Sequence, residues 1–197
     1  MSLRDQRREA TRRAIAEAAR DLLEERGADA LTFRAIARRV GVSVGTVVNH
    51  AGTKAQLVVG LLVEDISAAM ERQSKAPVPD LPLERLVATF RPFFENYAAR
   101  PSLARHTILE VAFAADEAFM PYLELTLRFV GQLATTLEQE GRLHPHVSPM
   151  VAARVLFDTY IGVVVLFLRA EEPDVEAGTA ALRGSFEALM PVLFEVR

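Results

Sequence analysis

The segment from Thr32 to His50 constrains the fold of this chain more than any other. Its first half carries apolar residues at helical spacing, namely Phe33, Ile36, Ala37 and Val40. Gly41 ends this short element, and Ser43 is a suitable N-cap for a second short helix that reaches about His50. Val42 would point from the turn back into a core. The spacing therefore predicts a helix-turn-helix.

Helical spacing continues over nearly the whole chain. Before the helix-turn-helix, one apolar stripe consists of Ile15, Ala18, Ala19, Leu22 and Leu23. After it, Thr53 caps a helix that runs to about Arg72, and the three prolines of Ser74–Pro82 cannot lie inside a helix. We expect further helices at 82–100, 101–115, 121–141, 149–170 and 174–196. The sequence thus predicts an all-α fold of nine helices, with no convincing strand.

The charge is divided unequally along the chain. Residues 1–60 hold eleven basic and seven acidic residues, a balance of +4, and the remainder has a balance of −7. Five basic residues fall within the first thirteen positions: Arg4, Arg7, Arg8, Arg12 and Arg13. A basic end favours a module that faces a polyanion, although a solubilising arm explains the charge equally well. We expect a DNA-binding domain with an arginine-rich arm over 1–52 and a helical domain over 53–197.

Several classes of protein are disfavoured by what the sequence lacks. There is no cysteine, which excludes disulfides, thiolate zinc sites and cysteine nucleophiles. We find no nucleophile–base cluster and no glycine-rich phosphate loop, so neither catalysis nor a cofactor is expected. His144 and His146 form a His-x-His pair, which is weak evidence for a metal and more typical of a surface loop. The longest apolar run, Ile161–Leu168, is far shorter than the ~20 residues of a membrane span. The absence of cysteine fits the cytoplasmic protein that we expect.

The second helix of the motif is the predicted reading element for double-stranded DNA. Small residues at its start allow the backbone to approach the major groove closely, and Thr46 can contact a base edge or a thymine methyl group. Arg34 and Lys54 are placed for phosphates, and the arginine arm adds an attraction that salt weakens. The candidate DNA contacts are Arg34, Ser43, Val44, Gly45, Thr46, Asn49, His50 and Lys54.

The segment Thr11–Leu57 resembles the N-terminal domain of the tetracycline-repressor (TetR) family. The matching positions are Ile15, Ala18–Ala19, Gly27, Thr32, Ile36–Ala37, Gly41–Val42–Ser43, Gly45–Thr46, Lys54 and Leu57. The resemblance implies an all-helical homodimer that binds a palindromic operator, and a larger C-terminal domain that binds a small-molecule effector. A ligand-responsive repressor is therefore the expected function.

Two positions depart from the family pattern. Val48 stands where the family commonly has Tyr, and Ala51 stands where it has Phe or another bulky apolar residue. Loss of the tyrosine hydroxyl would remove a phosphate contact of about 1 kcal/mol. Ala51 would leave the corner between the third and fourth helices less filled, unless Leu57 or Phe33 repacks there. These departures support an alternative, a helical small-molecule-binding protein whose DNA recognition is weakened or lost.

Three consecutive helices of the C-terminal domain combine aromatic and polar residues that are able to build an effector pocket. The candidates, with one residue of the eighth helix, are Phe90, Phe94, Tyr97, His106, Glu110, Phe113, Tyr122, Thr126, Phe129 and Asp158. Aromatic residues at helical spacing are also typical of an ordinary core. If Glu110 and Asp158 are buried and line one cavity, a cationic or hydroxylated ligand is expected, because a buried carboxylate needs a partner.

The two terminal helices are the predicted dimer interface. The last helix carries a heptad-like seam that consists of Leu182, Phe186, Leu189, Leu193 and Val196. The preceding helix is apolar around much of its circumference. The resemblance implies that helices 149–170 and 174–196 pair with their copies in a four-helix bundle, and a monomer with two core helices is the alternative.

Overall fold

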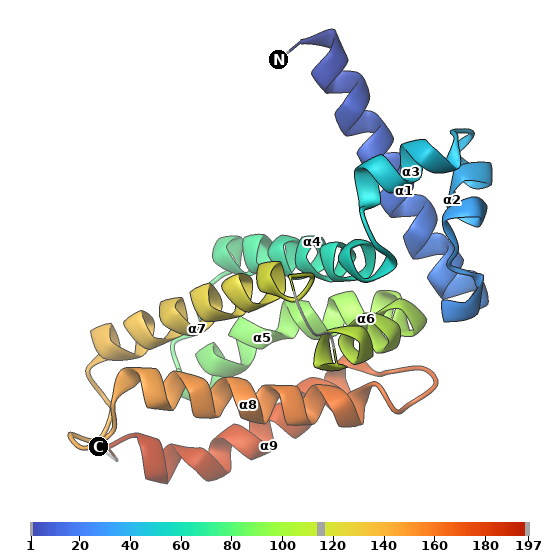
Figure 1. Cartoon of the computed structure of the whole chain (residues 1–197). Coiled ribbons are helices and arrows are strands. Elements are labelled where there is room, and N and C mark those ends of the chain that lie inside the picture. Colours follow the sequence, from blue (N-terminus) through green and yellow to red (C-terminus); the bar gives the residue numbers. More distant parts are fainter. Residues whose placement is uncertain (1, 114–116, 196–197) are drawn as a thin grey trace. The chain divides into compact units, whose positions relative to one another are not determined.

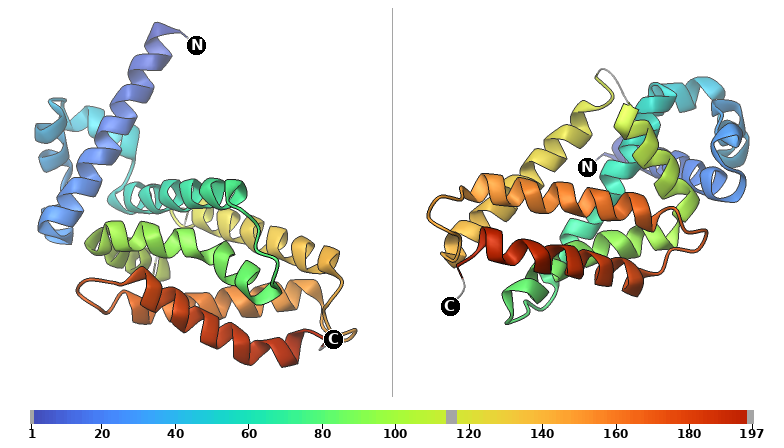
Figure 2. Two further views of the ribbon diagram at one scale, coloured as in Figure 1. Left: turned by 180° about the vertical axis from the view of Figure 1, so that it is seen from behind. Right: turned by 90° about the horizontal axis from the view of Figure 1, so that it is seen from below.

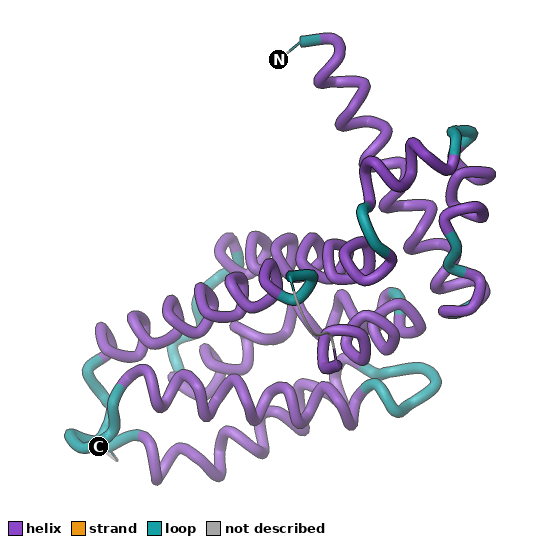
Figure 3. The backbone as a smooth tube through the Cα atoms, in the orientation of Figure 1, coloured by secondary structure: helices purple, strands orange, loops and turns teal. Residues whose placement is uncertain are grey.

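The computed structural model describes residues 2–113 and 117–195, except for the side chain of Phe113. Within these residues the chain forms nine α-helices and one short 3-10 helix, joined by loops (Figures 1 and 3). Outside the helices, an isolated antiparallel β-bridge joins the backbones of Leu143 and Phe194. The predicted all-α class is therefore confirmed.

The first three α-helices begin where the sequence offers a side-chain cap. Helix α1 (Leu3–Arg26) starts with a capping box, in which Ser2 and Asp5 each accept a hydrogen bond from the other's backbone N–H. A 3-10 helix (Ala28–Ala30) follows. Helix α2 (Phe33–Val40) is capped by Thr32 and α3 (Val44–Ala51) by Ser43. These caps satisfy backbone N–H groups that a helix leaves unpaired at its start.

The turn between α2 and α3 depends on Gly41. This residue has a φ of 77°, a left-handed backbone conformation that residues with a Cβ atom adopt only at a cost in free energy. The N–H groups of Gly41 and Val42 both donate to the carbonyl oxygen of Ala37, at 2.9 and 3.0 Å. The turn closes tightly on the end of α2 and directs the chain into α3.

The longer helices follow. Helix α4 spans Lys54–Lys75. The others are α5 (Pro82–Ala99), α6 (Pro101–Phe113), α7 (Met120–Glu140), α8 (Pro149–Phe167) and α9 (Val175–Leu193). Pro92 lies inside α5, whereas Ser148 and Asp174 cap α8 and α9.

The chain forms two compact units. Unit 1 contains the residues up to Glu64 together with Arg100–Tyr122, and unit 2 contains Asp65–Ala99 and the residues from Leu123 onward. Unit 1 thus includes the start of α4 and all of α6 as well as the helix-turn-helix, a different division from the one expected after residue 52. In unit 2, α9 packs on α5 and α8, and Figure 2 shows α8 and α9 side by side.

Unit 1 is held together by an apolar cluster that positions α3. Val47, the inward residue of α3, is fully buried, as are Leu23 of α1 and Ile36 of α2. Leu61 of α4 and Leu103 of α6 belong to the same cluster. Because these side chains leave water together, the orientation of α3 is fixed by the core.

Candidate nucleic-acid interface

Helix α3 presents one continuous exposed face. Val44, Gly45, Val48 and Asn49 are exposed at spacings of one, four and five residues, opposite the buried Val47. Ser43 is also exposed, and its hydroxyl accepts a hydrogen bond from the backbone of Thr46 at 3.0 Å. The Thr46 hydroxyl lies 2.9 Å from the same oxygen atom. This face consists of small or uncharged side chains, which allow the helix to approach the major groove closely.

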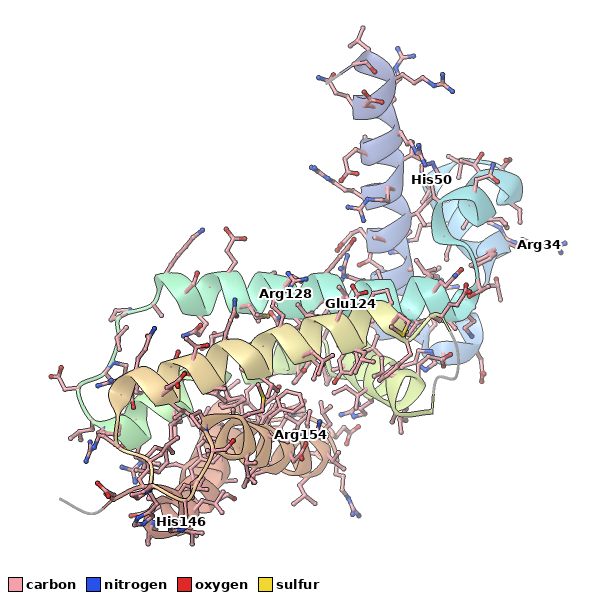
Figure 4. All side chains as sticks on the ribbon, turned by 60° about the vertical axis from the view of Figure 1, so that its left-hand side comes forward. Arg34, His50, Glu124, Arg128, His146 and Arg154 are labelled. Atoms are coloured by element: carbon pink, nitrogen blue, oxygen red, sulfur yellow. The ribbon has the colours of Figure 1, made fainter. Side chains whose placement is uncertain are left out.

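The charged residues that were expected to flank this face differ in whether their side chains already have a partner within the protein. Arg34, in the first turn of α2, is exposed, points outward (Figure 4) and has no ion pair among the described residues. His50 is half-buried at the end of α3. Lys54 is exposed, but its ammonium group donates to the carbonyl oxygen of Ala28 at 3.2 Å. Arg34 is therefore the freer cation of the two that were expected to meet phosphates.

The arginine-rich arm is a helix, because α1 already begins at Leu3. Its first turns extend past the rest of the helix-turn-helix (Figure 1). The side chains of three exposed arginines take part in no hydrogen bond or ion pair with the described part of the chain: Arg4, Arg7 and Arg8. Arg12 and Arg13 instead bind Glu9, at 3.0 and 2.9 Å, and these hydrogen bonds lower the pKa of Glu9 to about 2. Arg12 also pairs with Glu64.

The corner between α3 and α4 is hollow. A cavity of about 100 Å³ lies there, and Ile15, Ala51, Leu57 and Gly60 are among its lining residues. A side chain at Gly60 would meet no atom within 4 Å. The small residue at position 51 thus leaves the corner incompletely filled, as expected, and Leu57 lines the hollow without closing it.

The aromatic residues expected around a ligand are packed against one another instead. Phe90 is fully buried, and its ring centre lies 4.6 Å from Tyr160 and 5.5 Å from Phe129. Phe94 contacts Tyr160 at 5.7 Å, and the Tyr160 hydroxyl donates to that of Tyr97 at 3.3 Å. Unit 2 therefore brings four of the candidates together, in an arrangement that forms a core.

The two candidate carboxylates lie in different surroundings. Asp158 is exposed on α8 and pairs with Arg154 one turn away, at 2.8 Å, so the condition that both carboxylates are buried is not met. The cause is that Asp158 occupies the side of α8 that faces away from the core, where a carboxylate stays hydrated. Glu110 is half-buried in unit 1, and its charge acts on His106.

The remaining candidates do not form one group either. The His106 Nε2 atom is buried without a hydrogen-bond partner among the described residues. Tyr122 contacts Phe119 at a ring distance of 5.6 Å, and Thr126 is half-buried on α7. The Phe113 side chain lies outside the described residues.

The outer faces of α8 and α9 are unusually apolar. The seam residues Leu182, Phe186 and Leu193 are buried within the chain itself, and Val196 lies outside the described residues. On the outer side, α8 exposes Val151, Val165 and Leu166, and α9 exposes Ala181, Gly184, Ala188 and Val192. Among the described helices, α8 is long and apolar enough to cross a membrane by length and composition alone.

One feature of unit 2 was not foreseen from the sequence. A cavity of about 490 Å³, partly open to solvent, is lined by the end of α4, the proline-rich segment Ser74–Pro82, the first half of α5 and the middle of α7. It includes Phe129 of the candidate set, but also Gln73, Arg85 and Gln132. The sequence feature next to this cavity is the proline cluster of Ser74–Pro82. Because these prolines cannot continue a helix, α4 ends here and a loop leads to α5.

Comparisons with known proteins agree with this geometry. Residues 15–61 match the model of the bacterial regulatory proteins of the tetR family. The chain is 25% identical over 182 residues to the HTH-type transcriptional regulator UidR of Escherichia coli (strain K12), an alignment that covers 89% of this chain and 87% of that protein.

Solved structures share the fold along most of the chain. One is NalD, the secondary repressor of the MexAB-OprM multidrug efflux pump in Pseudomonas aeruginosa, with a TM-score of 0.65, 24% identity and coverage of 95% and 98% of the two chains. Another, a protein from Saccharomonospora viridis in complex with choline, has a TM-score of 0.66, 20% identity and coverage of 95% and 100%. The match over residues 15–61 shows that the chain carries the N-terminal region of the tetR family of bacterial regulatory proteins, and the solved structures show that it shares their fold.

Proposed function

We propose that this regulator is a repressor that binds a palindromic operator as a homodimer and leaves it when a small-molecule effector binds. The observation that carries the proposal is the exposed face of α3, together with the exposed Arg34 and the three arm arginines that have no hydrogen bond or ion pair with the described part of the chain. UidR is a transcriptional regulator, not an enzyme, and NalD is a repressor, which supports the same role here. Such a protein acts where the chromosome is, in the cytoplasm.

The contacts divide into those that read sequence and those that position the protein. Thr46 and Asn49 are the residues able to bond base edges, and Val44 and Val48 offer apolar contacts to thymine methyl groups. Arg34 and the arm arginines meet phosphates, whose attraction depends on salt. Because Val48 has no hydroxyl group, operator affinity relies more on these cations.

A mobility-shift titration against DNA from upstream of the protein's own coding region tests this assignment. We expect Arg34→Ala and Thr46→Ala each to weaken binding by roughly 1–3 kcal/mol, or about five- to 150-fold. Arg128→Ala removes one positive charge from exposed α7 and is the matched control, with affinity unchanged. Full binding by both head variants would contradict the proposed interface.

The salt dependence gives a second measurement. Replacing Arg7 and Arg8 with Gln should flatten the plot of log affinity against log salt by about two phosphate contacts. Replacing Arg13, which binds Glu9, should change the slope less. If wild-type affinity barely falls as salt rises, or if no DNA is bound, the alternative of a helical ligand-binding protein without DNA recognition takes its place.

The proposed dimer interface is the exposed outer face of α8 and α9 in unit 2. Its small residues Ala181, Gly184 and Ala188 allow two helices to approach closely, and Val165 and Leu166 provide apolar area. Exposed apolar residues gathered on neighbouring helices are typical of a protein–protein interface. Two recognition helices would then enter successive major grooves.

Substitution of Gly184 by Arg tests the dimer. Gly184 is exposed and a Cβ atom there would meet nothing within 4 Å, so the protomer is expected to fold normally. Sedimentation should show a monomer, and operator affinity should fall because one head alone makes half of the contacts. Gly131→Arg on α7, also with open space, is the control. A dimer that survives Gly184→Arg would place the interface elsewhere.

The effector acts by favouring one conformation. A ligand that binds more tightly to a state whose heads are wrongly spaced shifts the population toward that state, and a difference of a few kcal/mol is sufficient. Helix α4 is the natural element of such a change, because its residues belong to unit 1 up to Glu64 and to unit 2 from Asp65.

A further inference from the structure

The cavity under the proline-rich segment of unit 2 has the size of a ligand site. Its volume of about 490 Å³ lies within the range of roughly 300–1,000 Å³ that small-molecule sites occupy. Met70 of α4, Val78 of the segment, and Phe129 and Leu133 of α7 give it an apolar part. In the aromatic core nearby, Phe90 and Phe94 are instead fully buried, and both rings contact that of Tyr160.

The charged groups of the cavity are already paired within the protein. The Arg85 guanidinium donates to Glu140 at 2.7 Å and to the carbonyl oxygens of Pro79 and Asp80, each at 3.0 Å. The Glu71 carboxylate accepts from Lys75 at 2.7 Å. In this partly open cavity a charged ligand would find no unoccupied counter-charge, so any hydration that it lost would not be compensated by an ion pair. The lining therefore favours an uncharged molecule.

The uncharged polar groups offer more acceptors than donors. The hydroxyl groups of Ser74, Thr89 and Thr136 each donate to a backbone carbonyl oxygen of their own helix, at 2.9, 2.9 and 3.1 Å. Their oxygen atoms remain available only as acceptors. The side-chain amides of Gln73 and Gln132 have no hydrogen-bond partner among the described residues, and each offers both donors and an acceptor.

We propose that this cavity is the effector site, and that it binds an uncharged, hydroxyl-bearing molecule with one apolar face. The inference rests on the proposed function in one respect, that the regulator responds to a small molecule. The hydroxyl groups of the ligand donate to the threonine and serine oxygens and to the two glutamine amides, and its apolar face covers Met70 and Leu133.

The position of the cavity also gives the ligand a means of acting on α4. Met70, Gln73 and Ser74 are in the last turns of α4, whereas Gln132 and Thr136 are on α7. A molecule that bonds to both helices fixes the distance between them. The other end of α4 starts at Lys54, three residues after the recognition helix ends, so the constraint is applied to the helix that follows the reading element directly.

The absence of cysteine allows a direct test in the full-length protein. Ser74→Cys places a unique thiol at the cavity, and Ser67→Cys places one on exposed α4, two turns earlier and outside the lining. Each variant is equilibrated with benzyl disulfides that carry a hydroxymethyl, an aminomethyl or a carboxylate group, under a fixed excess of reductant. Intact-mass measurement gives the labelled fraction.

We expect the hydroxymethyl probe to label the Ser74→Cys variant about tenfold more strongly than the Ser67→Cys variant, equivalent to about 1.4 kcal/mol. The two charged probes should show no such gain. Adding Gln132→Leu to Ser74→Cys should reduce the gain several-fold, because one amide partner is lost. Equal labelling of both variants, or a preference for the aminomethyl or carboxylate probe, would overturn the assignment.

Operator binding by the same two thiol-bearing variants separates this proposal from the proposed function. Selective labelling without DNA binding keeps the cavity assignment and contradicts the repressor. DNA binding with unselective labelling would support the repressor and contradict the cavity assignment, so that the effector must bind elsewhere.

Discussion

The corner between α3 and α4 and the aromatic core of unit 2 are packed in opposite ways. At the corner, Ala51 and Gly60 leave a hollow of about 100 Å³ beside the recognition helix. In the core, the rings of Phe90, Phe94 and Phe186 are fully buried, and a Cβ atom on Gly178 would lie only 2.7 Å from Phe167. The region that resembles a DNA reader has room to adjust, whereas the aromatic rings expected to surround a ligand are packed against one another. Local rearrangement costs the least free energy where packing is incomplete.

The prediction with the largest expected effect concerns a ring in the aromatic core. Phe90→Ala should lower the free energy of unfolding by about 3–5 kcal/mol, because it deletes buried contacts and leaves a cavity. Chemical denaturation measures the change. Leu127→Ala, at a side chain that is 59% exposed on α7, should stay within about 0.5 kcal/mol of wild type. A small loss for Phe90→Ala would mean that this ring lines an open pocket after all.

A pair of glycines on α9 tests how tight the core is. Gly178→Ala should destabilise the protein by about 1–3 kcal/mol, since the added methyl group overlaps Phe167 and Phe94. Gly184→Ala is matched in chemistry and helix but has open space around it. There the better helix propensity of Ala should make the helix more stable, by up to about 1 kcal/mol. Equal effects in thermal unfolding would show that α9 does not pack closely on α8 and α5.

At the corner the expected sign is reversed. Ala51→Leu should raise the free energy of unfolding by about 1 kcal/mol, because the larger side chain fills the hollow. Ala10→Leu, on the exposed surface of α1, controls for the change in side-chain type and should be neutral. A loss of stability on Ala51→Leu would indicate that Leu57 already closes the corner in solution.

The smallest effect depends on pH. Burial lowers the pKa of His106 below its ordinary value of 6.5; the charge of Glu110 opposes this and that of Lys54 adds to it. The unfolded chain therefore binds the proton more tightly, so this stability is fully present above about pH 6.5 and is lost as pH falls toward the folded pKa.

Unfolding free energies at pH 7.5 and pH 5.5 measure this contribution. His106→Gln should make the difference between the two pH values smaller than in wild type. A difference that is as large in the variant would assign the acid sensitivity to other groups.

The helix-turn-helix was the part most open to prediction from sequence. Thr32, Gly41 and Ser43 act on their immediate neighbours, so their roles as caps and turn follow from local chemistry. The hollow at Ala51 was also predictable, because a small residue stood where the family has a bulky one.

Features that depend on distant residues were harder to predict. Helix α9 was expected to reach Val196, yet it ends at Leu193, where Phe194 turns to pair with Leu143. Asp158 was a ligand candidate because it interrupts an otherwise apolar helix, but that apolarity extends to the outer face of α8, and Asp158 is exposed. Whether an aromatic stripe forms a core or a pocket depends on how several helices meet, and the sequence of one helix does not contain that information.

Helix α4 has a mechanical consequence. Its 22 residues form a rod about 33 Å long, without a proline to interrupt it. A rod of that length that tilts by about 10° around one end moves its other end by about 6 Å, more than one turn of helix. A small tilt of the helix near Ser74 therefore becomes a larger displacement at Lys54. Gly60 is the weakest point for helix formation within α4, and bending there would reduce that displacement.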